Sequence, residues 1–236
     1  MSEQKVAVIG GTGDLGYGLA LRWAWAGVPA VVIGSRDEKK AQDAAERAKA
    51  AIISGAFPSF AHSFSVTGLE NAQAAAQASV VVLTVPFPAQ AGILKSIRGS
   101  LRDAVLVDTT VPLAATVGGR ATRMVGVWQG SAAEQARELV PAGTPVLAAF
   151  HNLEAKMLQD LTAPLDCDIL VCGDEEPAKQ TLFPLIKLIP GLRPIDAGPL
   201  EMARIVEAMT ALLISVNRRY RVKQSGISIT GLDSLL

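Results

Sequence analysis

Short runs of β-branched and other apolar residues alternate along this chain with longer, alanine-rich stretches that carry scattered charges. The apolar runs are nearly continuous, which predicts strands covered on both faces rather than strands with one face in water. Strands that alternate with helical stretches are typical of βαβ units, which build a parallel sheet. The pattern predicts strands at residues 5–9, 30–33, 79–85, 104–108 and 146–150.

The stretches between these strands predict helices, because they are longer, rich in alanine and carry scattered charges, as the helices of βαβ units do. These helices are expected at residues 14–26, 37–51, 68–77, 88–98 and 131–139. The intervening segment 52–66 mixes Gly, Pro, Phe and Ser, which predicts an irregular loop followed by a short extended segment.

After residue 150 the spacing of the elements changes. Helices are predicted at residues 154–161, 176–189 and 200–222, and extended segments at residues 169–172 and 193–196. We therefore predict an α/β fold, a Rossmann-type doubly wound parallel sheet with a smaller C-terminal α+β part. Residues 1–150 would form the nucleotide-binding domain and residues 151–236 the smaller part.

Composition narrows the possible ligands. The 22 basic and 22 acidic residues give zero net charge, which argues against a general attraction to nucleic acid or to an anionic membrane surface. No apolar run approaches the roughly 20 residues of a spanning helix, and no secretory signal precedes the first strand, so a cytoplasmic location is expected. Cys167 and Cys172 are too few for a disulfide framework or a four-ligand zinc site, and no metal site is expected.

The first candidate site is the segment VAVIGGTGDLG at residues 6–16, where an apolar strand stops at glycines and a helix begins. Gly11, Gly13 and Gly16 satisfy the pattern G-x-G-x-x-G, which permits a tight turn, close approach of the backbone to a pyrophosphate, and packing of the helix on the strand. Thr12 and Asp14 lie at the loop tip, and Asp14 is also a suitable N-cap. An ordinary glycine turn is the alternative, but position after the first strand favours dinucleotide binding.

The residues after the second predicted strand select the cofactor. Gly34, Ser35 and Arg36 stand where an NAD enzyme usually carries an acid that binds the ribose hydroxyls. Ser35 can donate to a 2′-phosphate, Arg36 offers a charged planar fork, and Lys40 lies one helical turn further on the same face. A solvated helix start is the alternative explanation of these charges. We predict NADP(H) rather than NAD(H).

Several separated segments of the chain resemble one family, the deazaflavin-dependent NADP reductases, which transfer a hydride between NADP(H) and coenzyme F420. The matching segments are IGGTGDLGYGLALR, IGSRDEKKA, VTGLENAQAA, VVLTVPFPA, AAFHNL, DILVCGDEE and GLRPIDAGPLEMARIVEAMTALL. The resemblance implies a Rossmann domain with a smaller C-terminal part, the deazaflavin in the cleft between them, and a homodimer. It also implies reversible hydride transfer as the activity.

The resemblance assigns residues to both coenzymes. It places Gly11, Thr12, Gly13, Asp14 and Leu15 at the pyrophosphate, and Ser35, Arg36 and Lys40 at the 2′-phosphate. It places Thr84, Val85 and Pro86 beside the nicotinamide, followed by Phe87 where the family often has Trp. It places His151, Leu153, Arg204 and Thr210 near the deazaflavin, with His151, Leu153 and Pro86 lining the site of hydride transfer. Ala208 departs from members that carry Ser.

Direct hydride transfer needs two rings held in contact, so no catalytic side chain is required. His151 has a structural alternative, as a hydrogen-bonded residue at a strand end. Arg204 has another, as the ion-pair partner of Glu201 or Glu207. The basic residues at 218–223 could attract an acidic coenzyme tail or simply suit a helix C-terminus, and the second is preferred.

Two other functions remain open from the sequence. One is an NADPH-dependent reductase of a small imine or ketone, for which Lys156 or His151 would supply a proton. The other is a non-enzymatic NADP sensor. The apolar ending ITGLDSLL is a candidate contact with a partner subunit.

Overall fold

The computed structural model describes residues 4–54 and 64–232. Its larger sheet is parallel, with the strand order β3-β2-β1-β4-β5-β6. The six strands are β1 (Lys5–Ile9), β2 (Ala30–Ser35), β3 (Val66–Glu70), β4 (Val80–Leu83), β5 (Val105–Asp108) and β6 (Val146–Ala148). This order reverses at β1 and β4, as in doubly wound nucleotide-binding folds, so the predicted fold class is confirmed.

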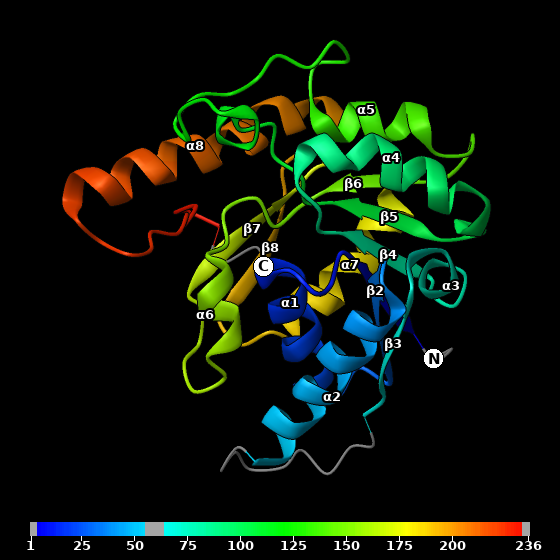
Figure 1. Ribbon diagram of the computed structural model, residues 1–236. Coiled ribbons are helices and arrows are strands. Elements are labelled where there is room, and N and C mark those ends of the chain that lie inside the picture. The colour runs from blue at the N-terminus through cyan, green and yellow to red at the C-terminus, as the bar shows by residue number, and fades with distance from the viewer. Residues whose placement is uncertain (1–3, 55–63, 233–236) are drawn as a thin grey trace.

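Helices cover both faces of this sheet (Figure 1). The longer ones are α1 (Asp14–Trp25), α2 (Glu38–Ser54), α4 (Phe87–Ile97), α5 (Ala132–Leu139), α7 (Glu176–Lys187) and α8 (Ala203–Tyr220). The shorter ones are α3 (Asn71–Ala75), α6 (Ala155–Gln159) and the 3-10 turns η1 (Arg98–Ser100), η2 (Ala114–Val117) and η3 (Leu200–Met202).

Alternate residues of each strand point to opposite faces, which creates two hydrophobic clusters. Val6 and Val8 of β1 join the cluster under α1, α2 and α7, whereas Ala7 and Ile9 join the cluster under α3, α4, α5 and the start of α8. Both clusters include residues from either side of residue 150. The division into domains at that residue therefore stays a prediction.

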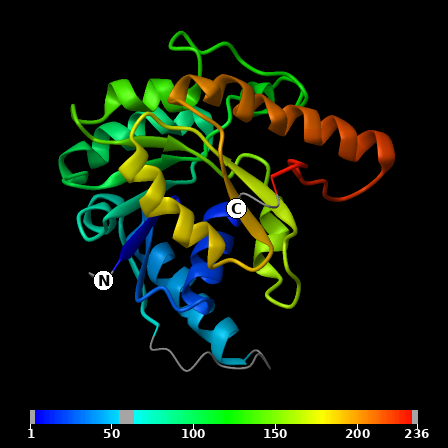
Figure 2. The same ribbon diagram turned by 180° about the vertical axis from the view of Figure 1, so that it is seen from behind.

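The C-terminal part adds a second, two-stranded parallel sheet of β7 (Cys167–Val171) and β8 (Leu192–Asp196). Buried Arg22 of α1 links this part to the larger sheet, because its guanidinium donates to the backbone oxygens of Met157, Leu158, Asp160 and Ala163 around the end of α6. The C-terminal half of α8 extends beyond the rest of the chain (Figures 1 and 2).

Two predictions about elements need correction. Residues 68–70 belong to the edge strand β3 and not to a helix, because Gly68 brings its backbone directly against Ala41 of α2, where a Cβ would overlap. The predicted loop at 52–66 begins later than expected, since α2 continues to Ser54, and residues 55–63 lie outside the described part of the chain. Residues 221–232 fold back onto the chain, since Asp168 N donates to Ile227 O and Ile229 packs against the second cluster. Residues 233–236 lie outside the described part of the chain, and the contact of residues 229–236 with a partner subunit stays a prediction.

None of the described helices combines the length and apolar character needed to cross a membrane.

Candidate functional site

A pocket of about 270 Å³ lies at the C-terminal edge of the larger sheet, where β1, β2 and β4 end. Its lining residues come from the four connections that follow β1, β2, β3 and β4, together with the helix α4: Gly10, Thr12, Gly13, Ser35, Arg36, Asp37, Lys40, Asn71, Thr84, Val85, Pro86, Ala89 and Ile93. The structure thus brings together the predicted residues of the glycine loop, of the end of β2 and of the end of β4. The order of strands reverses at this point, which is where open α/β sheets bind ligands.

The glycine loop is shaped by backbone contacts that exclude larger residues. Gly10 has a φ of +78°, and both Gly10 N and Gly11 N donate to Gly34 O, at 3.1 and 3.0 Å. A Cβ on Gly16 would overlap the Thr84 hydroxyl and lie 2.8 Å from the Cα of Gly11. The glycines therefore do what their spacing predicts: they permit the turn and let α1 pack against the end of β4.

The N-terminus of α1 has no side-chain cap, although Asp14 was a suitable candidate. The N-cap is Gly13, with extended backbone, and Asp14 is the first helical residue, exposed to solvent. The predicted capping role of Asp14 is therefore wrong. The uncapped first-turn N–H groups and the positive end of the helix dipole are left at the pocket, which suits an anion.

Ser35, Arg36 and Lys40 form the basic side of the pocket. Ser35 is buried, and its Oγ accepts from Asp37 N at 3.2 Å, which leaves the hydroxyl hydrogen free to donate. Lys40 Nζ is 4.0 Å from Asp37 Oδ2, a loose and exposed contact. Within residues 4–54 and 64–232, Arg36 forms no ion pair, so its charge is available to a ligand.

Four lining residues were not predicted from the sequence: Asp37, Asn71, Ala89 and Ile93. Asp37 caps α2, since its Oδ1 accepts from Lys40 N at 3.2 Å, and a helix start after the second strand is a signal that could have found it. Ala89 and Ile93 lie on α4 and, with Val85, give the pocket an apolar portion. Asn71 follows β3, which the sequence pattern did not predict as a strand.

Other predicted residues lie outside this pocket. Gly11, Asp14 and Leu15 belong to the same loop and helix start without lining it, and Phe87 is the first residue of α4. Leu153 lines a separate small cavity of about 50 Å³ near Asn152 and Cys167.

His151 and Thr210 are brought together by the return of α8. His151 follows β6 and is 4% exposed, and its backbone oxygen accepts from the Thr210 hydroxyl at 2.6 Å. Burial lowers the pKa of His151 to about 3, so the imidazole is neutral near pH 7. Neither ring nitrogen has a hydrogen-bond partner among the described residues. A neutral imidazole is a poor proton donor, and Lys156 is exposed on α6, which weighs against a reductase that needs either as an acid.

Arg204 pairs with a residue that the sequence did not suggest. Its Nε and Nη2 donate to the two carboxylate oxygens of Glu134, at 2.8 and 2.6 Å. The predicted structural alternative, an ion pair with Glu201 or Glu207, is therefore wrong in its partner. Glu207 instead accepts from Ala132 N and Ala133 N at the start of α5, at 2.9 and 3.0 Å.

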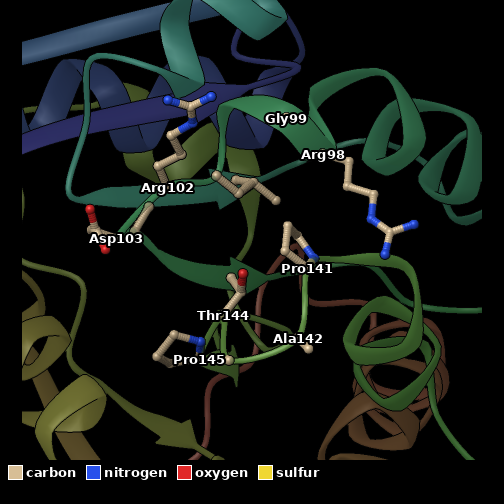
Figure 3. A pocket seen from close by; sticks show the side chains of 11 residues that line it. Arg98, Gly99, Arg102, Asp103, Pro141, Ala142, Thr144 and Pro145 are labelled. Carbon is tan, nitrogen blue, oxygen red and sulfur yellow. The ribbon is translucent and has the colours of Figure 1, made fainter.

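A larger pocket of about 560 Å³ lies at the opposite, N-terminal edge of the sheet, between the loops that precede β5 and β6 (Figure 3). Arg98 and Arg102 both line it, but their side chains point in different directions (Figure 3). The loops around this pocket contain no glycine motif. The pocket lies at the C-terminal end of η1 and not at a helix N-terminus. Among the described residues, no group of three or more His, Cys, Asp or Glu side chains could hold a metal ion.

Comparisons with known proteins agree with this geometry. The family model described as NADP oxidoreductase coenzyme F420-dependent matches residues 5–112. An F420-dependent NADP reductase of Methanothermobacter thermautotrophicus is 50% identical over 97% of this chain and 95% of its own length. The corresponding reductase of Methanothermobacter marburgensis is 45% identical over 97% of this chain and 99% of its own.

A solved structure leads to the same family. A candidate F420-dependent NADP reductase of Arthrobacter sp. FB24 superimposes with a TM-score of 0.76 and 25% identity, covering 96% of this chain and 99% of that one. The resemblance found in the sequence is thereby confirmed, and with it the oxidoreductase class. The chain belongs to the F420-dependent NADP reductase family.

Proposed function

We propose that this chain transfers a hydride reversibly between NADP(H) and the deazaflavin coenzyme F420; its relatives are named F420-dependent NADP reductases. The observation that carries the proposal is the pocket at the C-terminal edge of the sheet. There, an uncapped helix N-terminus, a glycine turn and the unpaired charge of Arg36 meet in a chain of this family.

The residues of this pocket fit NADP(H). A Cβ on Gly10 would come within 2.6 Å of the Val85 side chain. Glycine at this position therefore lets the loop pack against Val85 while its backbone N–H groups stay accessible to a pyrophosphate. Thr12 and Gly13 would hold the pyrophosphate, and Ser35, Arg36 and Lys40 would hold the 2′-phosphate. Charge-assisted hydrogen bonds of this kind are about twice as strong as neutral ones, which favours NADP(H) over NAD(H).

Thr84, Val85 and Pro86 lie at the end of β4 and would position the nicotinamide. Thr84 is itself held in place, because its hydroxyl donates to Ile9 O at 2.9 Å. The two bound coenzymes supply the chemistry, the passage of a hydride between rings with one proton exchanged with water. The protein's contribution is to hold the two rings in contact and to exclude water.

The deazaflavin would lie on the far side of the nicotinamide, near His151, Leu153, Arg204 and Thr210. This assignment rests on the family resemblance. The buried, neutral His151 suits a wall that excludes water from a hydride. The ion pair of Arg204 with Glu134 fixes the guanidinium in one orientation, while its side chain stays 53% exposed.

The test is direct. The purified protein is mixed with NADPH and oxidised coenzyme F420, and the visible absorbance of the deazaflavin is followed. We expect the absorbance to fall only when the protein and NADPH are both present, and to fall much more slowly with NADH. Persistent colour with NADPH would exclude the proposed activity and favour an NADP sensor.

We also propose a homodimer that forms through α8. Four apolar residues of this helix recur at spacings of four, three and four: Ile205, Met209, Leu212 and Val216. Ile205 is 54% and Leu212 is 60% exposed, although such a stripe is typical of a helix packed on another helix. A second copy of the chain would cover it. Sedimentation should give twice the monomer mass, and a Leu212→Glu variant should give a monomer.

The cytoplasmic location and the absence of membrane or nucleic-acid partners stay predictions from composition and charge.

A further inference from the structure

One side of α8 carries three polar side chains at intervals of three residues: Arg204, Glu207 and Thr210. Residues at this spacing are neighbours on the surface of a helix. Glu207 is the middle one and is 1% exposed, whereas the Arg204 side chain is 53% exposed. The family resemblance places Arg204 and Thr210 near the deazaflavin, and it assigns no role to Glu207.

Glu207 joins α8 to the beginning of α5. Its two carboxyl oxygens accept from Ala132 N and Ala133 N, at 2.9 and 3.0 Å. The next N–H group of the first turn, that of Glu134, donates to the hydroxyl oxygen of the N-cap Ser131 at 3.1 Å. The start of α5 is thus satisfied jointly by its own N-cap and by a side chain of α8. Because two oxygens meet two adjacent N–H groups, this contact fixes both the position and the rotation of α8 relative to α5.

Two neighbouring contacts depend on the same position of α8. One turn before Glu207, Arg204 pairs with Glu134, and one turn after it, the Thr210 hydroxyl donates to His151 O at 2.6 Å. His151 follows Phe150, whose φ of +67° is a strained conformation for a residue with a side chain. The Thr210 hydroxyl therefore holds the chain directly after a strained residue, and a shift of α8 would release it.

We propose that Glu207 is a positioning residue, which seats α8 on α5 so that Arg204 and Thr210 are held in place for the deazaflavin; this inference rests on the proposed function. Glu207 is itself buried, so it acts through the helix and not by contact with the coenzyme. Among the described residues, those that line the proposed NADP(H) pocket come from elements other than α5 and α8. The effect of Glu207 should therefore be confined to the second coenzyme.

Two simpler roles for Glu207 predict different results. A role through charge alone has the opposite sign, because removing a negative charge would strengthen the binding of a coenzyme with an acidic tail. A role in folding alone would reduce the amount of folded protein and leave the dissociation constants of both coenzymes unchanged. Positioning instead predicts weaker binding of the deazaflavin and unchanged binding of NADPH in the folded protein.

The experiment measures the dissociation constants of NADPH and of oxidised coenzyme F420 by fluorescence titration at pH 9. Burial raises the pKa of Glu207 to about 8, so at pH 9 the group is ionised and both oxygens can accept. Glu207→Gln replaces one oxygen by an amide that cannot accept. The dissociation constant of F420 should rise about threefold to tenfold, the effect of one lost hydrogen bond, and that of NADPH should change by less than about twofold. In turnover, the KM for F420 should rise in proportion, with kcat within about twofold of the wild type.

Glu201→Gln is the matched control. Glu201 is exposed on η3, so this variant removes a carboxylate near Arg204 and leaves the hydrogen bonds at the start of α5 in place. It should keep both dissociation constants within about twofold of the wild type, since exposed charges are screened.

Glu207→Leu removes both acceptors and should weaken F420 binding more than Glu207→Gln does; if it does not fold, Glu207→Gln decides alone. Unchanged or tighter F420 binding in folded Glu207→Gln overturns the inference, and so does an equal loss of affinity for both coenzymes. Failure of the wild type to bind F420 overturns the proposed function instead.

Discussion

The two edges of the larger sheet each carry a pocket, and the larger pocket is at the edge without the features of a nucleotide site. The N-terminal edge encloses about 560 Å³ and the C-terminal edge about 270 Å³. Arg98 and Arg102 diverge at the first (Figure 3), whereas Arg36 and Lys40 line the second beside a glycine loop. At the C-terminal edge, strands end where helices begin, so N–H groups and helix dipoles point into the pocket.

The comparison shows that the direction of the strands and helices, more than the volume of a pocket, determines which edge suits an anionic ligand. In a parallel sheet every helix that follows a strand begins at the C-terminal edge and ends near the N-terminal edge. Anions are therefore favoured at one edge and cations at the other. Arg98, in the turn that follows α4, suits the negative end of that helix and needs no ligand to explain it.

The largest expected difference between the edges concerns two glycines. In Gly16→Ala, the new Cβ meets the Thr84 hydroxyl and the backbone of Gly11, so the glycine loop must shift. We expect no measurable binding of NADPH and a loss of about 1–3 kcal/mol in the free energy of unfolding, as for other overpacked sites. Fluorescence titration and urea denaturation measure the two effects.

Gly99→Ala is the matched control, because nothing lies within 4 Å of a Cβ at Gly99, at the N-terminal edge. This variant should bind NADPH as the wild type does and should unfold at the same or slightly higher urea concentration. Equal behaviour of the two variants would remove the structural basis for calling the C-terminal pocket the nucleotide site.

The second difference concerns the arginines. Arg36→Gln should weaken NADPH binding by about tenfold to a hundredfold, the effect of losing hydrogen bonds to a charged group, and should leave NADH binding nearly unchanged. Arg98→Gln should change neither affinity by more than about twofold, since exposed charges far from a ligand are screened. If Arg98→Gln lost more NADPH affinity than Arg36→Gln, the cofactor would lie at the N-terminal edge, and the proposed site would be wrong.

Local sequence was sufficient to predict the C-terminal edge as a binding edge. The glycines at positions 11, 13 and 16 come directly after the first strand in the sequence, and Arg36 comes directly after the second. Both features could therefore be predicted from neighbouring residues. Strand β3 was missed because it lies at the edge of the sheet, with only Val66 and Gly68 fully buried, and its glycine resembles a helix boundary. With β3 unassigned, Asn71 could not be placed beside β2.

Contacts between residues far apart in the sequence could not be predicted from local sequence patterns. Arg204 and Glu134 are separated by 70 positions, and their bidentate pairing depends on how α8 crosses α5. The same crossing places Glu207 at the start of α5, where its carboxyl group replaces a local cap. Helical periodicity predicts each helix separately but carries no information about which pairs of helices meet.

The third and smallest difference between the two edges concerns buried acidic residues. Among the described residues around the two pockets, buried acidic side chains lie at the C-terminal edge alone. Burial raises the pKa of Asp108, at the end of β5, to about 6, and that of Glu207 to about 8. Asp103, at the N-terminal edge, is exposed. A carboxyl group whose pKa is raised by folding keeps its proton longer in the folded chain than in the unfolded chain. The contribution of such a carboxyl group to stability is therefore full at low pH and is lost as the pH rises towards the folded-state pKa.

Because Asp108 has completed its contribution near pH 6, Glu207 accounts for the loss between about pH 6 and pH 8. Over that interval the free energy of unfolding should fall by at most about 3 kcal/mol, since one pKa unit corresponds to about 1.4 kcal/mol. Urea denaturation of Glu207→Gln should lose this fall, because glutamine has no proton to lose and still offers one oxygen to the N–H groups of α5. A rise of up to about 1 kcal/mol should remain, because burial lowers the pKa of His151 to about 3 and the unfolded chain alone takes up that proton near pH 6. Asp103→Asn should keep the wild-type slope, and the same slope in Glu207→Gln would assign the titration to another group.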